Sequence, residues 1–161
     1  MLVAVISDTH GISKRKELLD KIKGGIRKAD ILIHLGDYIS DIPYIAEDFN
    51  GKVYGVKGNG DFKGEYPREQ VIEILDKKLL ICHGDQYGVG YNLNNLYYKA
   101  KELGVDGALF GHTHIPLIEN YDNILFFNPG SASLPRGLSK KSIGFLEIKE
   151  NEDIISYNVN L

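Results

Sequence analysis

Short runs of apolar, mostly β-branched residues recur along the chain between polar segments. Runs of this length are typical of buried strands, and we expect strands at residues 2–6, 31–35, 52–56, 79–82, 108–110 and 124–127. Helical spacing occurs at 44–49, at 93–103 and at 13–28, where Ser13 is placed to cap a helix whose apolar face comprises Leu18, Leu19, Ile22 and Ile26. The alternation of strand and helix in the first half predicts right-handed βαβ units and a largely parallel sheet.

The pattern changes after Arg68. An apolar run at 71–75, the polar turn at 76–78 and the next apolar run predict a hairpin. Further strands are expected at 115–119, 143–148 and 154–159. No linker-like segment or internal repeat interrupts the chain. We therefore expect a single α/β domain over residues 1–161, with a mixed sheet or two packed sheets and outer helices.

Composition and charge narrow the function classes. The hydrophobic fraction of 43% and the charged fraction of 25% are those of an average globular protein. The net charge of −3 and the scattered basic residues give no support for general nucleic-acid binding. Cys82 is the only cysteine, which excludes an internal disulfide and a zinc site built on several thiolates. Met1 leads directly into the first apolar run without a targeting or membrane segment, so we expect a cytoplasmic protein with no membrane association.

Polar residues with metal-binding chemistry follow five of the predicted strands. Taken singly, an Asp after a strand is more often a turn former, and a lone His is more often structural. Here four of the five histidines occupy such positions together with two Asp and one Asn. Loops at the carboxyl ends of strands converge in open α/β sheets, so these side chains are expected to meet. The set consists of Asp8, His10, Asp37, Asn59, His83, His112 and His114.

The spacing of these residues suits a cation site. In Asp8-Thr9-His10 and His112-Thr113-His114 the two polar residues are one residue apart, so in extended backbone they project to the same side. Neighbouring glycines allow sharp turns and a close approach to a ligand. Mixed imidazole and carboxylate ligands suit Mn, Fe, Ni, Co or Zn, whereas Mg and Ca prefer all-oxygen sites.

These residues resemble, in order, the signature blocks of a known family. The blocks are Asp8-Thr9-His10, Gly36-Asp37, Gly58-Asn59, His83-Gly84 and Gly111-His112-Thr113-His114, and Asn128-Pro129-Gly130-Ser131 extends the match. They are similar to those of the calcineurin-like metallophosphoesterases, especially the small single-domain prokaryotic phosphodiesterase branch. The resemblance implies a four-layer αββα sandwich of two mixed β-sheets with outer helices.

The resemblance also implies two divalent metal ions, with manganese or nickel favoured and Co²⁺, Zn²⁺ or Fe²⁺ as alternatives. Asp37 is expected to bridge them, because a carboxylate offers one oxygen to each ion. Asp8, His10 and His114 would complete one site, and Asn59, His83 and His112 the other. A hydroxide shared by two such ions is the expected nucleophile for phosphodiester hydrolysis. The catalytic residues would be Asp37, Asn59 and His112.

Other positions bear on the substrate. In many family members a histidine follows the Asn of the Gly-Asn block and can protonate the leaving group, but here the position is Gly60. We therefore expect a good leaving group or another proton donor. Asn59, Ser131 and Arg136 are candidate substrate contacts, and Tyr87, Tyr91, Tyr97 and Tyr98 are candidates for an aromatic wall. His34 is expected to have a structural role.

Alternative functions remain open from the sequence. A small phosphodiester or a nucleotide-like molecule is the expected substrate, with a phosphomonoesterase or nucleotidase as one alternative. A catalytically weak protein-binding scaffold on the same fold is another, and a homo-oligomer is left open. A dehydrogenase or nucleotide switch is disfavoured because the first strand is followed by Ser-Asp-Thr-His and no glycine-rich phosphate loop. No Gly-x-Ser-x-Gly elbow supports a serine hydrolase.

Overall fold

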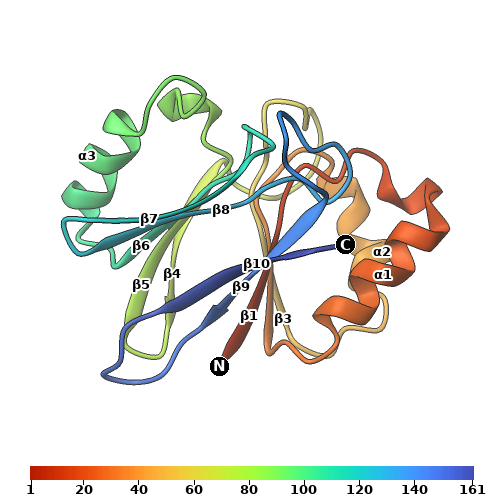
Figure 1. The fold of residues 1–161 in the computed structure, drawn as a ribbon, viewed down its shortest axis with the longest axis horizontal. Coiled ribbons are helices and arrows are strands. Elements are labelled where there is room, and N and C mark those ends of the chain that lie inside the picture. The colour runs from red at the N-terminus through yellow and green to blue at the C-terminus, as the bar shows by residue number, and fades with distance from the viewer.

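The structure is a computed structural model that describes residues 1–161 and contains two mixed five-stranded sheets (Figure 1). In the first sheet the strand order is β10-β9-β1-β2-β3, with β1, β2 and β3 parallel. In the second the order is β4-β5-β6-β8-β7, with β5, β6 and β8 parallel. The strands are β1 (Leu2–Ile6), β2 (Ile31–His34), β3 (Lys52–Gly55), β4 (Glu69–Ile74), β5 (Lys77–Cys82), β6 (Gly107–Leu109), β7 (Pro116–Tyr121), β8 (Ile124–Pro129), β9 (Ser142–Glu147) and β10 (Ile155–Asn160).

Three apolar clusters define four layers. The central cluster lies between the sheets and includes Val5 and Ile33 from one sheet and Ile81 and Phe127 from the other. A second cluster packs α1 (Lys16–Ile26) and α2 (Ile42–Ile45) on the outer face of the first sheet, and a third packs α3 (Asn94–Leu103) on the second sheet. Figure 1 shows these helices on opposite sides of the sheet pair. The expected αββα sandwich is therefore confirmed.

The expected strands and the hairpin formed by β4 and β5 are all present, but two helix predictions were wrong in extent. Ser13 does not cap α1. It lies in a 3₁₀ turn, Ile12–Lys14, and α1 begins at Lys16. The helix predicted at 44–49 is instead the single turn α2, preceded by a 3₁₀ turn at Ile39–Asp41. A third 3₁₀ turn, Asp85–Tyr87, precedes α3.

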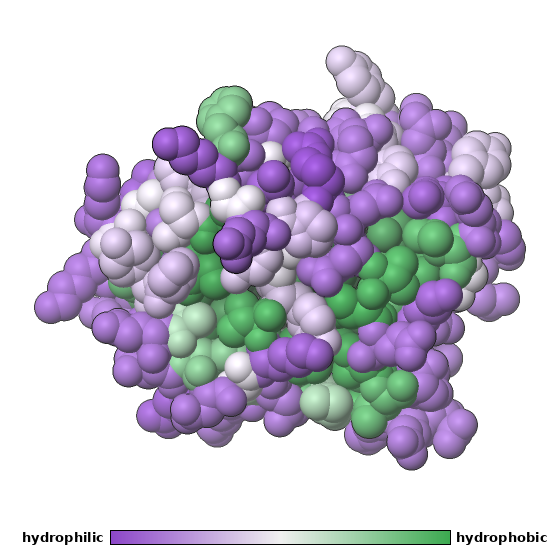
Figure 2. Space-filling view, turned by 180° about the vertical axis from the view of Figure 1, so that it is seen from behind, coloured by the Kyte–Doolittle hydropathy of each residue, from purple (hydrophilic) through white to green (hydrophobic).

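The surface is mixed in polarity. On the face opposite that of Figure 1, hydrophobic residues gather in two areas surrounded by hydrophilic ones (Figure 2). None of the helices combines the length and hydrophobicity needed to cross a lipid bilayer.

Candidate metal centre

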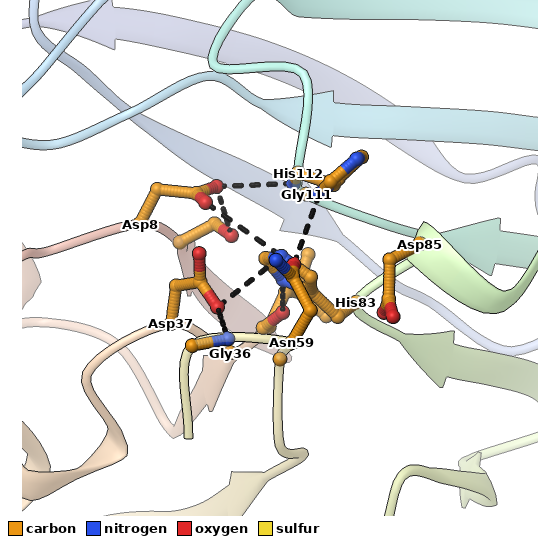
Figure 3. Close-up of polar contacts among 12 residues, drawn as sticks. Asp8, Gly36, Asp37, Asn59, His83, Asp85, Gly111 and His112 are labelled. Carbon is orange, nitrogen blue, oxygen red and sulfur yellow. Dashed lines mark hydrogen bonds and ion pairs between the residues drawn. The ribbon is translucent and has the colours of Figure 1, made fainter. Parts of the chain in front are cut away.

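All seven candidate ligands lie in loops that follow the carboxyl ends of strands. Loops after β1, β2 and β3 of the first sheet meet loops after β5 and β6 of the second. Figure 3 shows Asp8, Asp37 and His83 converging from three different loops, with Asn59 beside His83. The topology thus brings together residues that are more than 100 positions apart in sequence, as Asp8 and His114 are.

The first group consists of Asp8, His10, Asp37 and His114. One ligand atom from each of these four residues lies within 4.8 Å of the others. His114 Nε2 is 3.2 Å from Asp8 Oδ1, and His10 Nε2 is 3.8 Å from Asp37 Oδ2. These are the residues that the resemblance assigned to one metal, together with its bridging carboxylate.

The second group consists of Asn59, His83 and His112. The Nδ1 atom of His112 is 3.2 Å from the Oδ1 atom of Asn59, and the rings of His83 and His112 are 5.2 Å apart in edge-to-face orientation. His83 Nε2 lies 3.5 Å from Asp37 Oδ1. Asp37 therefore presents one carboxylate oxygen to each group.

The unpaired atoms at the centre of the cluster fit a cation. Asp8 Oδ1, His10 Nε2 and His83 Nε2 are buried and lack a well-aligned hydrogen-bond partner. Unsatisfied buried polar atoms are costly, and two divalent ions, one in each group, would satisfy all three. Their oxygen and imidazole chemistry suits a transition-metal ion. The residues present therefore fit a metal centre.

Hydrogen bonds orient the histidines for this role. His83 donates from Nδ1 to the carbonyl of Leu35 at 2.7 Å, and His114 donates from Nδ1 to the carbonyl of Leu134 at 2.6 Å. Each bond leaves Nε2 as the lone-pair nitrogen facing the carboxylates. Burial lowers the pKa of His10 and of His112, which favours the neutral, metal-binding imidazole. The nearby Asp8 carboxylate raises the pKa of His114.

Most of the candidate ligands also have an unusual backbone conformation. Five candidate ligands have positive φ angles between 48° and 67°, a region that side chains other than glycine rarely adopt. Such conformations persist only where the surroundings enforce them, and they cluster at functional sites. The five are Asp8, His10, Asp37, His112 and His114.

Two further aspartates, which the sequence pattern did not indicate, stabilise these loops by hydrogen bonds. Asp41 is buried and accepts hydrogen bonds from the Thr9 hydroxyl at 2.8 Å and from the backbone N–H groups of Gly11 and Ile12 at 2.9 Å. Asp61 accepts from the backbone N–H groups of Tyr38, Ile39 and Gly58 at 2.8–3.0 Å. Because an Asp in a loop is most often a local turn former, nothing in the sequence singled them out.

His34 stabilises the loops after β1 and β2 by hydrogen bonds from its buried ring. The N–H of Gly36 donates to His34 Nδ1 at 3.1 Å, which leaves the ring proton on Nε2 to donate to the Thr9 hydroxyl at 3.1 Å. Thr9, in turn, donates to Asp41. The geometry agrees with the structural role expected for His34.

Acidification is expected to destabilise the protein through His34. Burial lowers its pKa to about 4 in the folded chain, below the value of about 6.5 in an unfolded chain. The folded state with neutral His34 therefore has its full stability above about pH 6.5. As the pH falls towards about 4, the free energy of unfolding decreases by roughly 3 kcal/mol. Urea unfolding at several pH values measures this loss, and His34→Gln is expected to flatten the dependence. An equally steep dependence in that variant would contradict the assignment.

The proposed substrate contacts differ in their surroundings. Ser131 is fully buried, and its hydroxyl donates to the carbonyl of Asp8 at 2.8 Å, which favours a role in holding Asp8 over substrate contact. Arg136 is exposed, and its backbone N–H donates to the carbonyl of His114 at 3.2 Å, so substrate contact by its side chain stays a prediction. Asn59 is exposed at the centre.

Two of the four tyrosines proposed as an aromatic wall are engaged in other contacts. Tyr87 and Tyr97 pack into the cluster beneath α3, and their hydroxyls bond Glu69 and Asp122. The tyrosine that contacts a candidate ligand is Tyr38, whose ring centroid is 5.0 Å from that of His10. No sequence pattern pointed to Tyr38, because it follows Asp37 in an ordinary-looking turn.

Comparisons with known proteins agree with this architecture. The family model for the calcineurin-like phosphoesterase superfamily domain matches residues 1–151. The probable metallophosphoesterase MJ0623 of Methanocaldococcus jannaschii is 40% identical over 152 residues, which cover 93% of this chain and 77% of the relative. The phosphodiesterase YfcE of Escherichia coli is 32% identical over 172 residues, covering 91% and 88%.

A solved structure extends the comparison. The zinc complex of Vps29 from Entamoeba histolytica is 25% identical, with a TM-score of 0.74 and coverage of 99% of this chain and 98% of the other. The convergent loops and the match over nearly the whole sequence lead to one conclusion: the chain belongs to the calcineurin-like phosphoesterase superfamily and is a phosphoric ester hydrolase.

Proposed function

We propose that the protein is a divalent-metal-dependent phosphodiesterase acting on small diesters with acidic leaving groups. The observation that carries this proposal is the convergence of Asp8, His10, Asp37 and His114, with their ligand atoms within 4.8 Å of one another. Asp8, His10 and His114 would hold one ion and Asn59, His83 and His112 the other, with Asp37 between them. Manganese or nickel is the ion we favour. Bound there, two such ions would supply an activated water and neutralise charge on the phosphoryl oxygens.

The residues of the chain itself favour a diester. A doubly charged monoester would call for several cationic groups at the centre, and the Arg68 guanidinium is not free for this role because it is paired with the Asp85 carboxylate at 2.5 Å. Arg68 also donates to the carbonyl of Gly58, so it supports the Asn59 loop. Gly60 provides no side chain to protonate a poor leaving group. Both features favour a singly charged ester whose leaving group needs no protonation.

Hydrolysis assays with metal-loaded protein test the proposal. With Mn²⁺ or Ni²⁺, bis(p-nitrophenyl) phosphate should be cleaved faster than p-nitrophenyl phosphate and much faster than glycerol phosphate. A chelator should abolish cleavage. Tight metal content without hydrolysis under any ion would instead favour the scaffold alternative, and faster cleavage of alkyl monoesters would favour a monoesterase.

Enlarging Gly58 by one methyl group is expected to disturb the centre. A Cβ atom there would lie 2.1 Å from Asp37 Oδ1 and 2.6 Å from the Asp37 backbone nitrogen, so the Asp37 loop must shift. We expect Gly58→Ala to lower the free energy of unfolding by about 1–3 kcal/mol and hydrolysis by roughly 10- to 100-fold.

Gly24→Ala is the matched control for Gly58→Ala. Gly24 lies in α1, and no atom outside its chain neighbours and its own helix backbone lies within 4 Å of the position that an added methyl group would take, so the helix should gain up to about 1 kcal/mol without a change in activity. Chemical unfolding and diester turnover measure both variants. Equal effects of the two substitutions would contradict the crowding at Asp37.

A further inference from the structure

A pocket opens beside the candidate metal centre between two exposed loops. It has a volume of about 440 Å³, in the range of small-molecule sites, and its walls include Tyr38, Ser40, Gly60, Phe62 and Lys63. We call it the Tyr38–Phe62 pocket. Two contacts join it to the centre. The N–H of Gly60 donates to Asp37 Oδ1 at 2.8 Å, and the Tyr38 ring lies 5.0 Å from the His10 ring.

The two walls of the pocket are fixed to one another. Asp61 lies in the second loop, and one of its carboxylate oxygens accepts hydrogen bonds from the N–H groups of Tyr38 and Ile39 in the first loop. Its other oxygen accepts from the N–H of Gly58 at 2.9 Å. Tyr38 itself has a φ of 69°, a strained conformation that this network maintains. The spacing of the walls is therefore built into the fold.

The pocket displays aromatic surface to solvent. Phe62 is 92% exposed and Tyr38 is 42% exposed, although burying such rings elsewhere would be favourable. At Gly60 the wall is backbone alone, so no side chain separates the pocket from Asp37. Lys63 adds a positive charge at the rim. Two accessible rings and a cation suit a planar, electron-rich ring system.

We propose that the Tyr38–Phe62 pocket binds a planar aromatic group, a nucleobase or an aryl ring, carried on one ester arm of the substrate. This proposal rests on the proposed phosphodiesterase function and adds the substrate class. Phe62 provides the stacking surface, and Tyr38 forms the wall that contacts the candidate ligand His10. The aromatic residues that select the substrate thus belong to the loops after β2 and β3, and not to α3.

A tryptophan at position 62 reports on the pocket directly. The chain contains no tryptophan, so Phe62→Trp introduces a single tryptophan, which can be excited at wavelengths that its ten tyrosines do not absorb. AMP is expected to quench its emission with saturation, whereas ribose 5-phosphate, which has the phosphate but no base, should not. Tyr98→Trp is the control, because Tyr98 is 67% exposed on α3 and should not respond. Equal quenching by both ligands, or none by AMP, would overturn the proposal.

Kinetics separate this proposal from the phosphodiesterase function itself. Phe62→Ala is expected to raise KM for bis(p-nitrophenyl) phosphate about tenfold with a smaller change in kcat, because stacking contributes to binding. Phe62→Tyr should restore KM, and Tyr98→Ala should leave it unchanged. If the unmodified protein hydrolyses the diester but Phe62→Ala does not change KM, the pocket assignment is wrong and the function stands. If AMP quenches Phe62→Trp but no diester is hydrolysed, the function is wrong and the pocket stands as a binding site.

Discussion

Asp37→Asn is expected to purify without either divalent ion and to lose diester hydrolysis by about 1,000-fold or more. The Asp37 carboxylate faces both groups of ligands, with Oδ1 3.5 Å from His83 Nε2 and Oδ2 3.8 Å from His10 Nε2. An amide in its place offers one neutral oxygen and cannot serve two cations. His114, by contrast, belongs to the first group of ligands only, so His114→Gln should lose one ion and retain the other.

The ratio of metal to protein after loading and gel filtration checks this prediction. The expected values are two ions for the unmodified chain, one for His114→Gln and none for Asp37→Asn. Asp48→Asn is a control for the loss of a carboxylate, because Asp48 is exposed and pairs with Lys23 away from the centre. One ion retained by Asp37→Asn would show that this carboxylate does not bridge.

The strands could be predicted because the signal that specifies them is local. Each central strand is built on a short apolar run that is buried on both faces, as the fully buried residues Val3 to Ile6 of β1 show. Such a strand must be packed on both faces, whichever strands it pairs with in its sheet. The division into two sheets was left open, because strand pairing depends on contacts far apart in sequence, such as β1 with β9.

Helix starts were predicted less well because distant groups replaced local caps. Ser13 has the right chemistry for a cap, but Asp41, some 30 residues away, accepts hydrogen bonds from the N–H groups of Gly11, Ile12 and Ser13 and holds this segment outside the helix. The chain therefore forms a 3₁₀ turn first, and α1 begins three residues later than Ser13. A tertiary hydrogen bond of this kind cannot be predicted from the residues near Ser13 in the sequence.

The candidate ligands could be predicted because residue type and position coincided at the ends of strands. The residues and backbone conformations that hold these ligands in place could not be predicted. Asp and His adopt positive φ angles more readily than most side chains, but the positive φ angles of Asp8 and His114 cannot be predicted from residue type alone. The same holds for Asp61, which links three backbone N–H groups from two loops. Tyr38 and Phe62 produced no signal either, since a single aromatic in a loop has no periodicity to be recognised.

Removal of the divalent ions is expected to lower Tm by roughly 8–16 °C. The centre holds two carboxylates, Asp8 at 0% and Asp37 at 7% exposure, together with buried nitrogen atoms that lack hydrogen-bond partners. Without a cation, the folded state carries the full cost of burying these groups. An ion that binds only the folded state, present at about 1,000 times its Kd, adds roughly 4 kcal/mol to the free energy of unfolding. For a domain of this size each kcal/mol corresponds to about 2–4 °C in Tm.

Thermal unfolding of one preparation, measured before chelation, after it and after reloading, tests this coupling of metal binding to folding. The fall in Tm should reverse on reloading with Mn²⁺ or Ni²⁺. Asp8→Asn should lose more than half of the metal-dependent increase, because Asp8 Oδ1 faces both His114 and His83. Asp48→Asn should retain it. If the ions are shown to leave while Tm stays constant, the seven side chains are stable as a set without a cation, and the coupling of metal binding to folding would be wrong.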